Sequence, residues 1–367
     1  MTTTTTATTR PAAPAERVGV LVVNVGTPDA PRPREVRRYL RQFLSDPRVI
    51  DVNPVGRWLL VNLIILPFRP RRSAEAYRAI WTDRGSPLLV HSRAFCDRLQ
   101  AALGERYAVA LGMGYGNPPI RAALDALRAQ GALRVVVFPQ FPQYAAATTG
   151  SALEAVYRAA SGTWDVPALS VVPPFHADPG FLSAWAGRAR AAIEELLPDL
   201  VLLSFHGLPE RQIRRSDRSG AHCLAGPDCC AALAPTNSHC YRAQCLETAR
   251  QLARALDLAE DRWAVSFQSR LGRVPWLRPY TDDVLRERAR AGVRRVLVLT
   301  PAFTADCLET LEEIGLRARE TFLAEGGQEL RVLPCPNDDP AWVEAAARIV
   351  RATAGDAAAG PVGQESS

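Results

Sequence analysis

The chain has 367 residues, of which 47% are hydrophobic and 22% are charged, and its formal net charge is +6. This length can bury a substantial core and favours two domains. The longest apolar run, "WLLVNLIILPF", is shorter than the roughly 18 to 20 residues that span a bilayer, and all 44 basic residues are Arg, which indicates a compositional bias and argues against a nucleic-acid surface.

The two ends of the chain are polar or rich in Ala and Gly, and we expect disordered tails at residues 1–15 and 354–367. The first of these lacks the apolar centre of a secretory signal. We therefore expect a cytoplasmic protein, in which thiols stay reduced and clustered cysteines more often bind metal than form disulfides.

Short β-branched runs alternate with Ala-, Arg- and Leu-rich helical stretches along the whole chain. In order, the clearest runs are "GVLVVNVGTP", "ALRVVVFPQFPQY", "DLVLLSFHGLP" and "RVLVLTPAF". Nearly continuous apolar strands with helices between them are typical of parallel sheets that are covered on both faces. The fold class predicted is α/β with doubly wound, Rossmann-like sheets.

The two halves of the chain resemble each other. "VGVLVVNVGTP" resembles "PDLVLLSFHGLP", which places Gly26 opposite Gly207, and "YAVALGMGYG" and "LRVVVFPQF" resemble "WAVSFQSRLG" and "RRVLVLTPAF". A chance likeness between two Val-rich folds is the alternative. We predict two similar domains, residues 16–167 and 168–353, each with extra chain after its first strand. Ligands of such folds bind beyond the carboxyl ends of the strands, so both inserts are expected near a shared cleft.

Three polar residues stand where strands are predicted to end. His206 follows an apolar strand and precedes a Gly, a place from which an imidazole can bind metal or accept a proton. Asp306 and Glu309 follow the strand that ends at Thr300, and a helix beginning near Ala305 would put both on one face of its first turn. The plainer interpretations are a structural histidine and a helix cap. Together the three could bind a divalent cation and remove protons from a ligand.

Several longer motifs carry a family resemblance. They are "LVVNVGTPDAPRPREVRRYLRQFLSDPRVID", "AIWTDRGSPLL", "GMGYGNPPI", "FPQYAAATTG", "SFHGLPER", "FQSRLGRVPWLRPYTD" and "ADCLETLEEI". These are similar, in family order from about Val18 to Val350, to segments of the ferrochelatases, enzymes that insert ferrous iron into a porphyrin to make haem. The resemblance implies two chelatase-type domains with the porphyrin cleft between them, in a lyase of haem biosynthesis.

The resemblance also implies roles for single residues. His206 would bind iron or accept a pyrrole proton, Glu309 would be its partner across the cleft, and Asp306 would support a proton path outward. The family often has His between these two acids, and Cys307 stands there instead, which puts only the proton path in doubt. The implied lining of the porphyrin cleft is Tyr144, Gln143, Trp276, Ser269, Met113 and Arg78. Met113 and Arg78 would serve packing or solvation equally well.

The extra chain of the first half, about residues 57–72, resembles the apolar lip with which family members touch a membrane, and its Arg-rich end suits anionic lipid. A core helix with a polar end is the alternative. The loop "NVGTP" favours protoporphyrin IX as substrate over coproporphyrin III, whose enzymes carry Tyr before that Gly. A tetrapyrrole or iron sensor on the same fold, and a chelatase for cobalt or nickel, stay open.

Five of the eight cysteines lie in "AHCLAGPDCCAALAPTNSHCYRAQC", within the extra chain of the second half (about residues 219–240) and just after it. Tyr241 and Cys245 match the ordinary family segment, so the added thiols are Cys223, Cys229, Cys230 and Cys240. Four thiolates are the count for a [2Fe–2S] cluster, and the insert resembles that of a bacterial group with an internal cluster. Structural Zn²⁺, with His222 and His239 available as ligands, and free or redox-active thiols are the alternatives. Cys245 is the reserve ligand.

Overall fold

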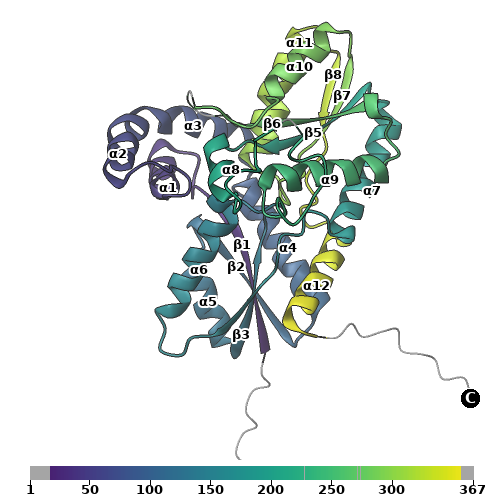
Figure 1. The fold of residues 1–367 in the computed structure, drawn as a ribbon. Helices are drawn as coiled ribbons and strands as arrows, with labels where there is room; N and C mark the ends of the chain where they lie inside the picture. Colours follow the sequence, from purple (N-terminus) through teal and green to yellow (C-terminus); the bar gives the residue numbers. More distant parts are fainter. Residues whose placement is uncertain (1–16, 227, 271, 273, 357–367) are drawn as a thin grey trace, which may run out of the picture.

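The computed structural model describes residues 17–226, 228–270, 272 and 274–356. It contains two four-stranded parallel sheets, one above the other in Figure 1, and helices cover both. The predicted α/β architecture with doubly wound sheets is therefore confirmed. The expected tail at residues 1–15 lies outside the described residues.

The first sheet has the strand order β2-β1-β3-β4, and neighbouring strands run parallel. Its strands are β1 (Arg17–Thr27), β2 (Tyr107–Gly116), β3 (Ala132–Pro139) and β4 (Ala168–Val171). The central strand β1 is buried over most of its length, as its Val-rich sequence predicts for a strand covered on both faces. Its flanking helices are α4 (Pro87–Leu103), α5 (Ile120–Ala129), η2 (a π-helix, Ala146–Gly150) and α6 (Ser151–Ser161).

The second sheet repeats this order as β6-β5-β7-β8, again parallel throughout. Its strands are β5 (Leu200–His206), β6 (Trp263–Gln268), β7 (Arg295–Leu299) and β8 (Glu329–Val332). The helices of this half are α7 (Pro179–Leu196), α8 (Glu210–Ser216), α9 (Tyr241–Ala255), η3 (Glu260–Arg262), α10 (Thr281–Arg290), η4 (a π-helix, Glu309–Ala318), α11 (Arg319–Ala324) and α12 (Pro340–Ala354).

The internal repeat predicted from the sequence is present in the structure, with β1 and β5 as equivalent central strands. Gly26, next to the last residue of β1, and Gly207, just after β5, lie at the same end of the two strands. A Cβ atom on Gly26 would lie 1.8 Å from the carbonyl oxygen of Tyr115, and one on Gly207 would lie 2.8 Å from that of Gln268. In both halves the neighbouring strand thus leaves room only for a residue without a side chain.

Two predicted boundaries are wrong. The domain boundary after residue 167 falls one strand too early, because β4 pairs in parallel register with β3 and completes the first sheet. The tail expected from residue 354 also begins too early. Asp356 accepts hydrogen bonds from the guanidinium of Arg106, at 2.7 Å, and from the hydroxyl of Tyr107. The remainder of that tail lies outside the described residues.

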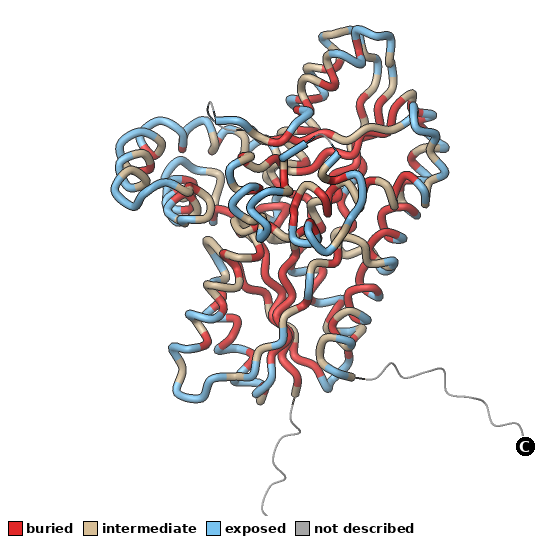
Figure 2. The backbone as a smooth tube through the Cα atoms, in the orientation of Figure 1, coloured by how far each residue is buried: buried red, intermediate tan, exposed pale blue. Residues whose placement is uncertain are grey.

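Extra chain between β1 and α4 forms a separate lobe, at the left in Figure 1. It consists of α1 (Pro33–Ser45), α2 (Pro54–Leu59), η1 (a π-helix, Leu60–Ile65) and α3 (Leu66–Ile80). Its own small core includes Val36, Leu40, Val61, Leu66 and Tyr77. Figure 2 shows that much of the rest of the lobe is exposed.

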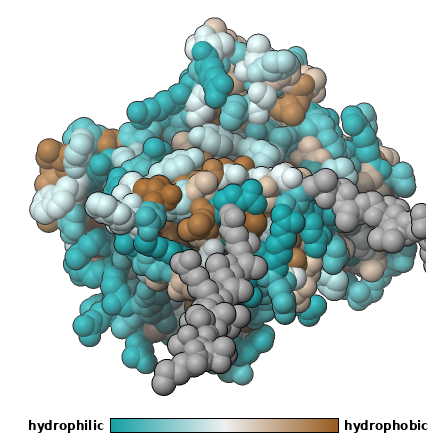
Figure 3. Space-filling model, turned by 90° about the horizontal axis from the view of Figure 1, so that it is seen from below, coloured by the Kyte–Doolittle hydropathy of each residue, from teal (hydrophilic) through white to brown (hydrophobic). Residues whose placement is uncertain are grey.

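The exposed side of the lobe carries large apolar residues. These are Val55, Trp58, Leu59, Leu63, Ile64 and Phe68. In Figure 3, apolar surface is visible at the end of the molecule where this lobe lies. The predicted lip at about residues 57–72 is thus helical. It carries apolar residues on its buried side, as a core helix does, and also on its exposed side, as an apolar lip does.

The last helix joins the two halves. In α12, Trp342 is fully buried and packs against Phe95 of α4, Phe138 of β3 and Phe175, with ring centroids 5.4 to 6.2 Å apart. The helix is therefore part of the second half in the sequence, but it also packs against the first half. This shared core packs the two halves against each other.

Candidate functional site

His206 is the last residue of β5, opposite Gln268 of β6. The next residue, Gly207, donates its backbone N–H to the carbonyl of Gln268 at 2.8 Å, which holds the end of β5 against β6. The imidazole is half-buried, and its Nδ1 lies 2.6 Å from the carbonyl oxygen of Gly207. Since a carbonyl only accepts, Nδ1 carries the proton in the neutral ring and Nε2 has the free lone pair that a metal or a proton requires.

Glu313, a residue that the sequence analysis missed, lies next to His206. Ser269, which follows β6, donates its backbone N–H to one carboxylate oxygen of Glu313 at 2.7 Å and its hydroxyl to the other at 2.5 Å. Burial raises the pKa of Glu313; the Ser269 hydrogen bond and the charge of His206 lower it, and the charge of Glu309 raises it. This carboxyl group is therefore poised to take up a proton more readily than an exposed one.

Glu309 is the first residue of η4 and is half-buried. Burial raises the pKa of the hydroxyls of Tyr39 and Tyr77, and the charge of Glu309 raises it further. Burial also lowers the pKa of the Arg69 guanidinium. The negative charge of Glu309 acts in the opposite direction and raises this pKa. Glu309 therefore faces the lobe, and the lobe contributes a guanidinium and two phenols to its surroundings.

Asp306 is placed differently from the prediction. No helix begins near Ala305; η4 starts at Glu309, so Asp306 lies in the loop before it and does not share a helix face with Glu309. It is 4% exposed, and its carboxylate accepts hydrogen bonds from the backbone N–H of Cys335, the hydroxyl of Thr310 and the amide of Asn337, at 2.8 to 3.1 Å. In this structure Asp306 ties two loops together.

Six further residues were predicted to line the cleft, and the structure brings only part of this set together. Ser269 lies in the group, bonded to Glu313. Trp276 lies beside it, because its backbone bridges to Pro209 and its ring carbon Cε3 would be 3.3 Å from a Cβ on Gly207. Tyr144 lies farther along, with its ring edge-on to His239 at 5.3 Å.

The other three have different surroundings. Gln143 is buried and donates to the hydroxyl of Thr248 and to the carbonyl of Pro301, so its amide links the two halves. Met113 is 1% exposed and belongs to the main core. Arg78 is exposed on α3, with its guanidinium 3.9 Å from the carboxylate of Glu75. The surroundings of Met113 are those of a packing residue, and those of Arg78 are those of a solvated surface residue.

The cysteine insert brings four thiols together. The sulfurs of Cys229 and Cys230 are 3.6 Å apart, and Cys240 is within hydrogen-bonding reach of both Cys223 and Cys230. Two thiolates on one tetrahedral metal with bonds of about 2.3 Å would lie about 3.8 Å apart. Cys245 is fully buried on α9 and hydrogen-bonded to Tyr241.

One histidine of the insert has a backbone partner, and the other packs on an aromatic ring. The Nε2 atom of His222 lies 2.9 Å from the carbonyl oxygen of Cys229, and His239 packs on Tyr144. Two N–H groups point at the sulfur of Cys229 instead, from the backbone of Leu224 at 3.3 Å and from Arg242 at 3.7 Å. The groups around the sulfur of Cys229 are thus a second thiol and two N–H groups.

Within the described part of the chain, no group of three or more His, Cys, Asp or Glu side chains is placed so that it could hold a metal ion. In the same residues, no helix is long and apolar enough to cross a membrane.

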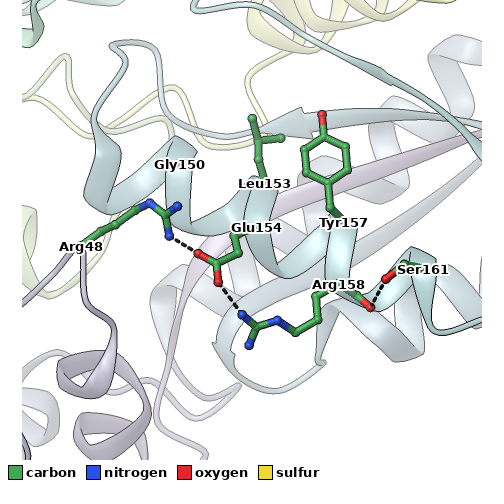
Figure 4. A pocket seen from close by; sticks show the side chains of 7 residues that line it. All are labelled: Arg48, Gly150, Leu153, Glu154, Tyr157, Arg158 and Ser161. Carbon is green, nitrogen blue, oxygen red and sulfur yellow. Dashed lines mark hydrogen bonds and ion pairs between the residues drawn. The ribbon is translucent and has the colours of Figure 1, made fainter. Parts of the chain in front are cut away.

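A groove of about 600 Å³ lies outside the group around His206. It runs along α6, and Figure 4 shows Glu154 between Arg48 and Arg158, with an ion pair to each. A smaller hollow of about 50 Å³ at the ends of β1 and β2 is lined by Asn24, Tyr115 and neighbouring residues. Neither of these two spaces contains His206, Glu309 or Glu313, so the chemistry of the site lies elsewhere.

Comparison with known proteins agrees with the sequence motifs. The family model described as ferrochelatase matches residues 17–354. The chain is 45% identical to a ferrochelatase of Coxiella burnetii (strain CbuG_Q212) over 335 residues, which is 91% of this chain and 93% of the relative. It is 48% identical to that of Azotobacter vinelandii over 334 residues, 90% of this chain and 98% of the relative.

Among solved structures, the sirohydrochlorin chelatase SirB from Bacillus subtilis subspecies spizizenii in complex with cobalt is similar in fold. Its TM-score is 0.52 at 14% sequence identity, over 93% of this chain and 96% of the other. At this identity the likeness concerns the fold alone, and it supports the chelatase-type architecture.

Proposed function

Since the chain belongs to the ferrochelatase family, whose members are metal-insertion lyases, we propose that it inserts ferrous iron into protoporphyrin IX to form protohaem, the final step of haem biosynthesis. The observation that carries this proposal is the group formed by His206, Glu309, Glu313 and Ser269 at the carboxyl ends of β5 and β6. It supplies a nitrogen ligand and two carboxylates within one site, and burial raises the pKa of one of these carboxyl groups, that of Glu313.

The reaction exchanges one Fe²⁺ for two pyrrole protons. The free Nε2 atom of His206 and the carboxylate of Glu309 would replace water around the iron, and each can also accept a pyrrole proton. Glu313 would receive a proton next, because burial has already raised its pKa. Ser269 holds Glu313 in place through two hydrogen bonds.

The test is anaerobic iron insertion, followed by the absorbance of the product, with His206→Ala and Glu309→Gln. We expect both variants to lose about a hundredfold or more in kcat, as removal of a positioned acid or base does. The matched control is Glu312→Gln. Glu312 lies on the same helix but pairs with Arg317 at 2.9 Å, so it should keep its rate. Retention of full activity by His206→Ala would refute the proposed site.

The substrate is proposed from the single loop "NVGTP". Parallel assays with protoporphyrin IX and coproporphyrin III compare kcat/KM directly, and a preference for coproporphyrin III would overturn this part of the proposal. A chain that binds porphyrin but inserts no iron into either would instead be a tetrapyrrole sensor.

We further propose that the insert binds a [2Fe–2S] cluster through Cys223, Cys229, Cys230 and Cys240. The proximity of the thiols, the 3.6 Å separation of two sulfurs and the contact of His222 with a backbone carbonyl support it. When bound, such a cluster can accept one electron and can cross-link the insert.

Iron, acid-labile sulfide and zinc, counted on protein purified without air, test this directly. We expect about two irons and two sulfides per chain, with loss of both in Cys230→Ser. Cys96→Ser, at a buried cysteine of α4 far along the chain from the insert, is the control. Colourless protein with one zinc per chain would refute the cluster.

The exposed apolar side of the lobe supports a third part of the proposal, peripheral contact with a membrane. Phe68 is 77% exposed and Trp58 is 59% exposed, and their burial in lipid would remove apolar surface from water. We expect the wild type to co-sediment with phosphatidylglycerol vesicles and the Trp58→Ser/Phe68→Ser variant to stay in solution. Trp164→Ser, at a residue 96% exposed outside the lobe, is the control and should sediment like the wild type.

A further inference from the structure

One ion pair links the two halves beside the candidate site. Arg211 of α8 binds Asp51, the residue just before the lobe helices α2 and α3, with Nε 2.9 Å from each carboxylate oxygen and a further contact from its terminal nitrogen. The Asp51 side chain is only 7% exposed. Burial acts to raise the pKa of Asp51, but hydrogen bonds from Arg211 and Gln212 hold it below its usual value. A planar guanidinium matched to both oxygens of a covered carboxylate is a contact of defined geometry.

The turn that contains Asp51 is held from several sides. Gln212, the next residue of α8, donates to the carbonyl of Arg48 at 3.2 Å. The guanidinium of Arg48 pairs with Glu154 of α6, the pair drawn in Figure 4. Arg57 of α2 donates back to the carbonyls of residues 50 and 52, at 3.3 and 3.1 Å. A shift of this turn would therefore move the start of the lobe helices with it.

The other partner, α8, is tied to the candidate site. It begins four residues after His206, and the backbone N–H of Glu210 donates to the carbonyl of Pro275 at 3.0 Å, next to Trp276. At its other end, Asp217 accepts from the backbone N–H groups of His222 and Cys223 and so anchors the cysteine insert. The helix thus connects the strand end with His206, the insert and, through Arg211, the lobe.

We propose that Arg211 and Asp51 are positioning residues that hold the lobe at a set distance from the strand end with His206 and so determine how tightly the porphyrin is held between them. This inference rests on the proposed function, because it takes the space between lobe and strand ends as the porphyrin site. Neither residue contacts the atoms that would hold iron. They act on the width of the space between the lobe and the strand end with His206.

This assignment predicts a particular kinetic signature. Breaking the pair removes one of the contacts that hold the lobe near β5, so we expect the porphyrin to be released faster while the iron-binding group of His206 and Glu309 stays intact. We expect Arg211→Gln and Asp51→Asn each to raise the KM for porphyrin about tenfold with little change in kcat. Arg211→Lys, which keeps the charge, should recover part of the loss.

The experiment combines three measurements on the full chain: steady-state iron insertion, porphyrin association and dissociation rates by fluorescence, and amide hydrogen exchange of residues 54–68. In the double variant Asp51→Asn/Arg211→Gln, the effects should not add, because both changes break one contact. Arg214→Gln is the matched control. Arg214 lies on the same helix and pairs with Glu210, at 2.9 Å, within α8.

Faster dissociation of porphyrin and faster exchange of the lobe in the two single variants, with the control unchanged, would support the proposal. A fall in kcat at constant KM, additive effects, or the same change in Arg214→Gln would overturn it. A wild-type chain that binds porphyrin without inserting iron would refute the proposed function alone, because the binding rates and the exchange of the lobe would still test the ion pair.

Discussion

Asp306 offers the sharpest test of whether a residue of the predicted site acts in chemistry or in structure. The family resemblance gave it a place on a proton path, whereas its carboxylate is 4% exposed and accepts hydrogen bonds from Cys335, Thr310 and Asn337. Replacement by Ala removes all three acceptor contacts. We expect Asp306→Ala to be strongly destabilised, and its pH–rate profile to keep its shape.

The size of this loss follows from what each donor can do afterwards. The N–H of Cys335 is fully buried and would be left without a partner, at about 1 to 3 kcal/mol. The hydroxyl of Thr310 has a second acceptor, the carbonyl of Cys307 at 3.3 Å, and the half-buried Asn337 can turn toward water. With the lost charge-assisted bonds, the free energy of unfolding should fall by roughly 3 kcal/mol, a large part of the usual 5 to 15 kcal/mol.

Chemical unfolding followed by circular dichroism measures this loss. Asp306→Asn keeps one acceptor oxygen and should cost about half as much. The matched control is Asp338→Asn, in the loop that contains Cys335 and Asn337, whose pair with Arg98 at 2.8 Å is partly exposed and should contribute less than about 1 kcal/mol. Wild-type stability in Asp306→Ala, together with a displaced pH–rate profile, would refute this reasoning and restore the proton path.

Three further predictions concern the site and the insert. Ser269→Ala removes a hydrogen bond that lowers the pKa of Glu313, so the pKa should rise further and the acid limb of the pH–rate profile should move to higher pH; an unmoved limb would contradict the role of Glu313. Gly207→Ala places a Cβ 2.8 Å from the carbonyl oxygen of Gln268 and should displace His206, lowering kcat by about a hundredfold at unchanged far-ultraviolet circular dichroism. Cys245→Ala should leave the iron and sulfide content unchanged, because that thiol is bonded to a tyrosine on α9, and loss of both would make it a ligand.

Much of the fold could be predicted from the sequence, because its signals are local. The Val-rich runs bounded by Gly and Pro located the central strands, and their repetition predicted two sheets of the same strand order. The place of His206 also followed, since an apolar strand followed by Gly is expected to end there, at the carboxyl end of the sheet. The short strand β4 was assigned to the wrong half, because only its pairing with β3 shows where it belongs.

The partners of the candidate-site residues come from distant parts of the chain, so the sequence alone could not predict which of them meet. The sequence paired Glu309 with Asp306, but η4 begins only at Glu309, and its geometry and the hydroxyl of Ser269 bring Glu313 into the group. The four-residue spacing of Glu309 and Glu313 was the one signal that could have indicated this. Spacing alone does not show which face of a helix is buried.

In the cysteine insert, too, some features could be predicted from the sequence and others needed the tertiary structure. The number of thiols and the family resemblance predicted a metal site with Cys223, Cys229, Cys230 and Cys240 as ligands and Cys245 in reserve, which stays a prediction. Only the fold decided that Cys245 faces Tyr241, that His222 is bound to a backbone carbonyl, and that Arg211 reaches Asp51 across 160 residues. Local sequence determines the backbone conformation of strands and turns. Charges and hydrogen-bonding groups acquire their roles from burial and from partners that only the folded chain brings together.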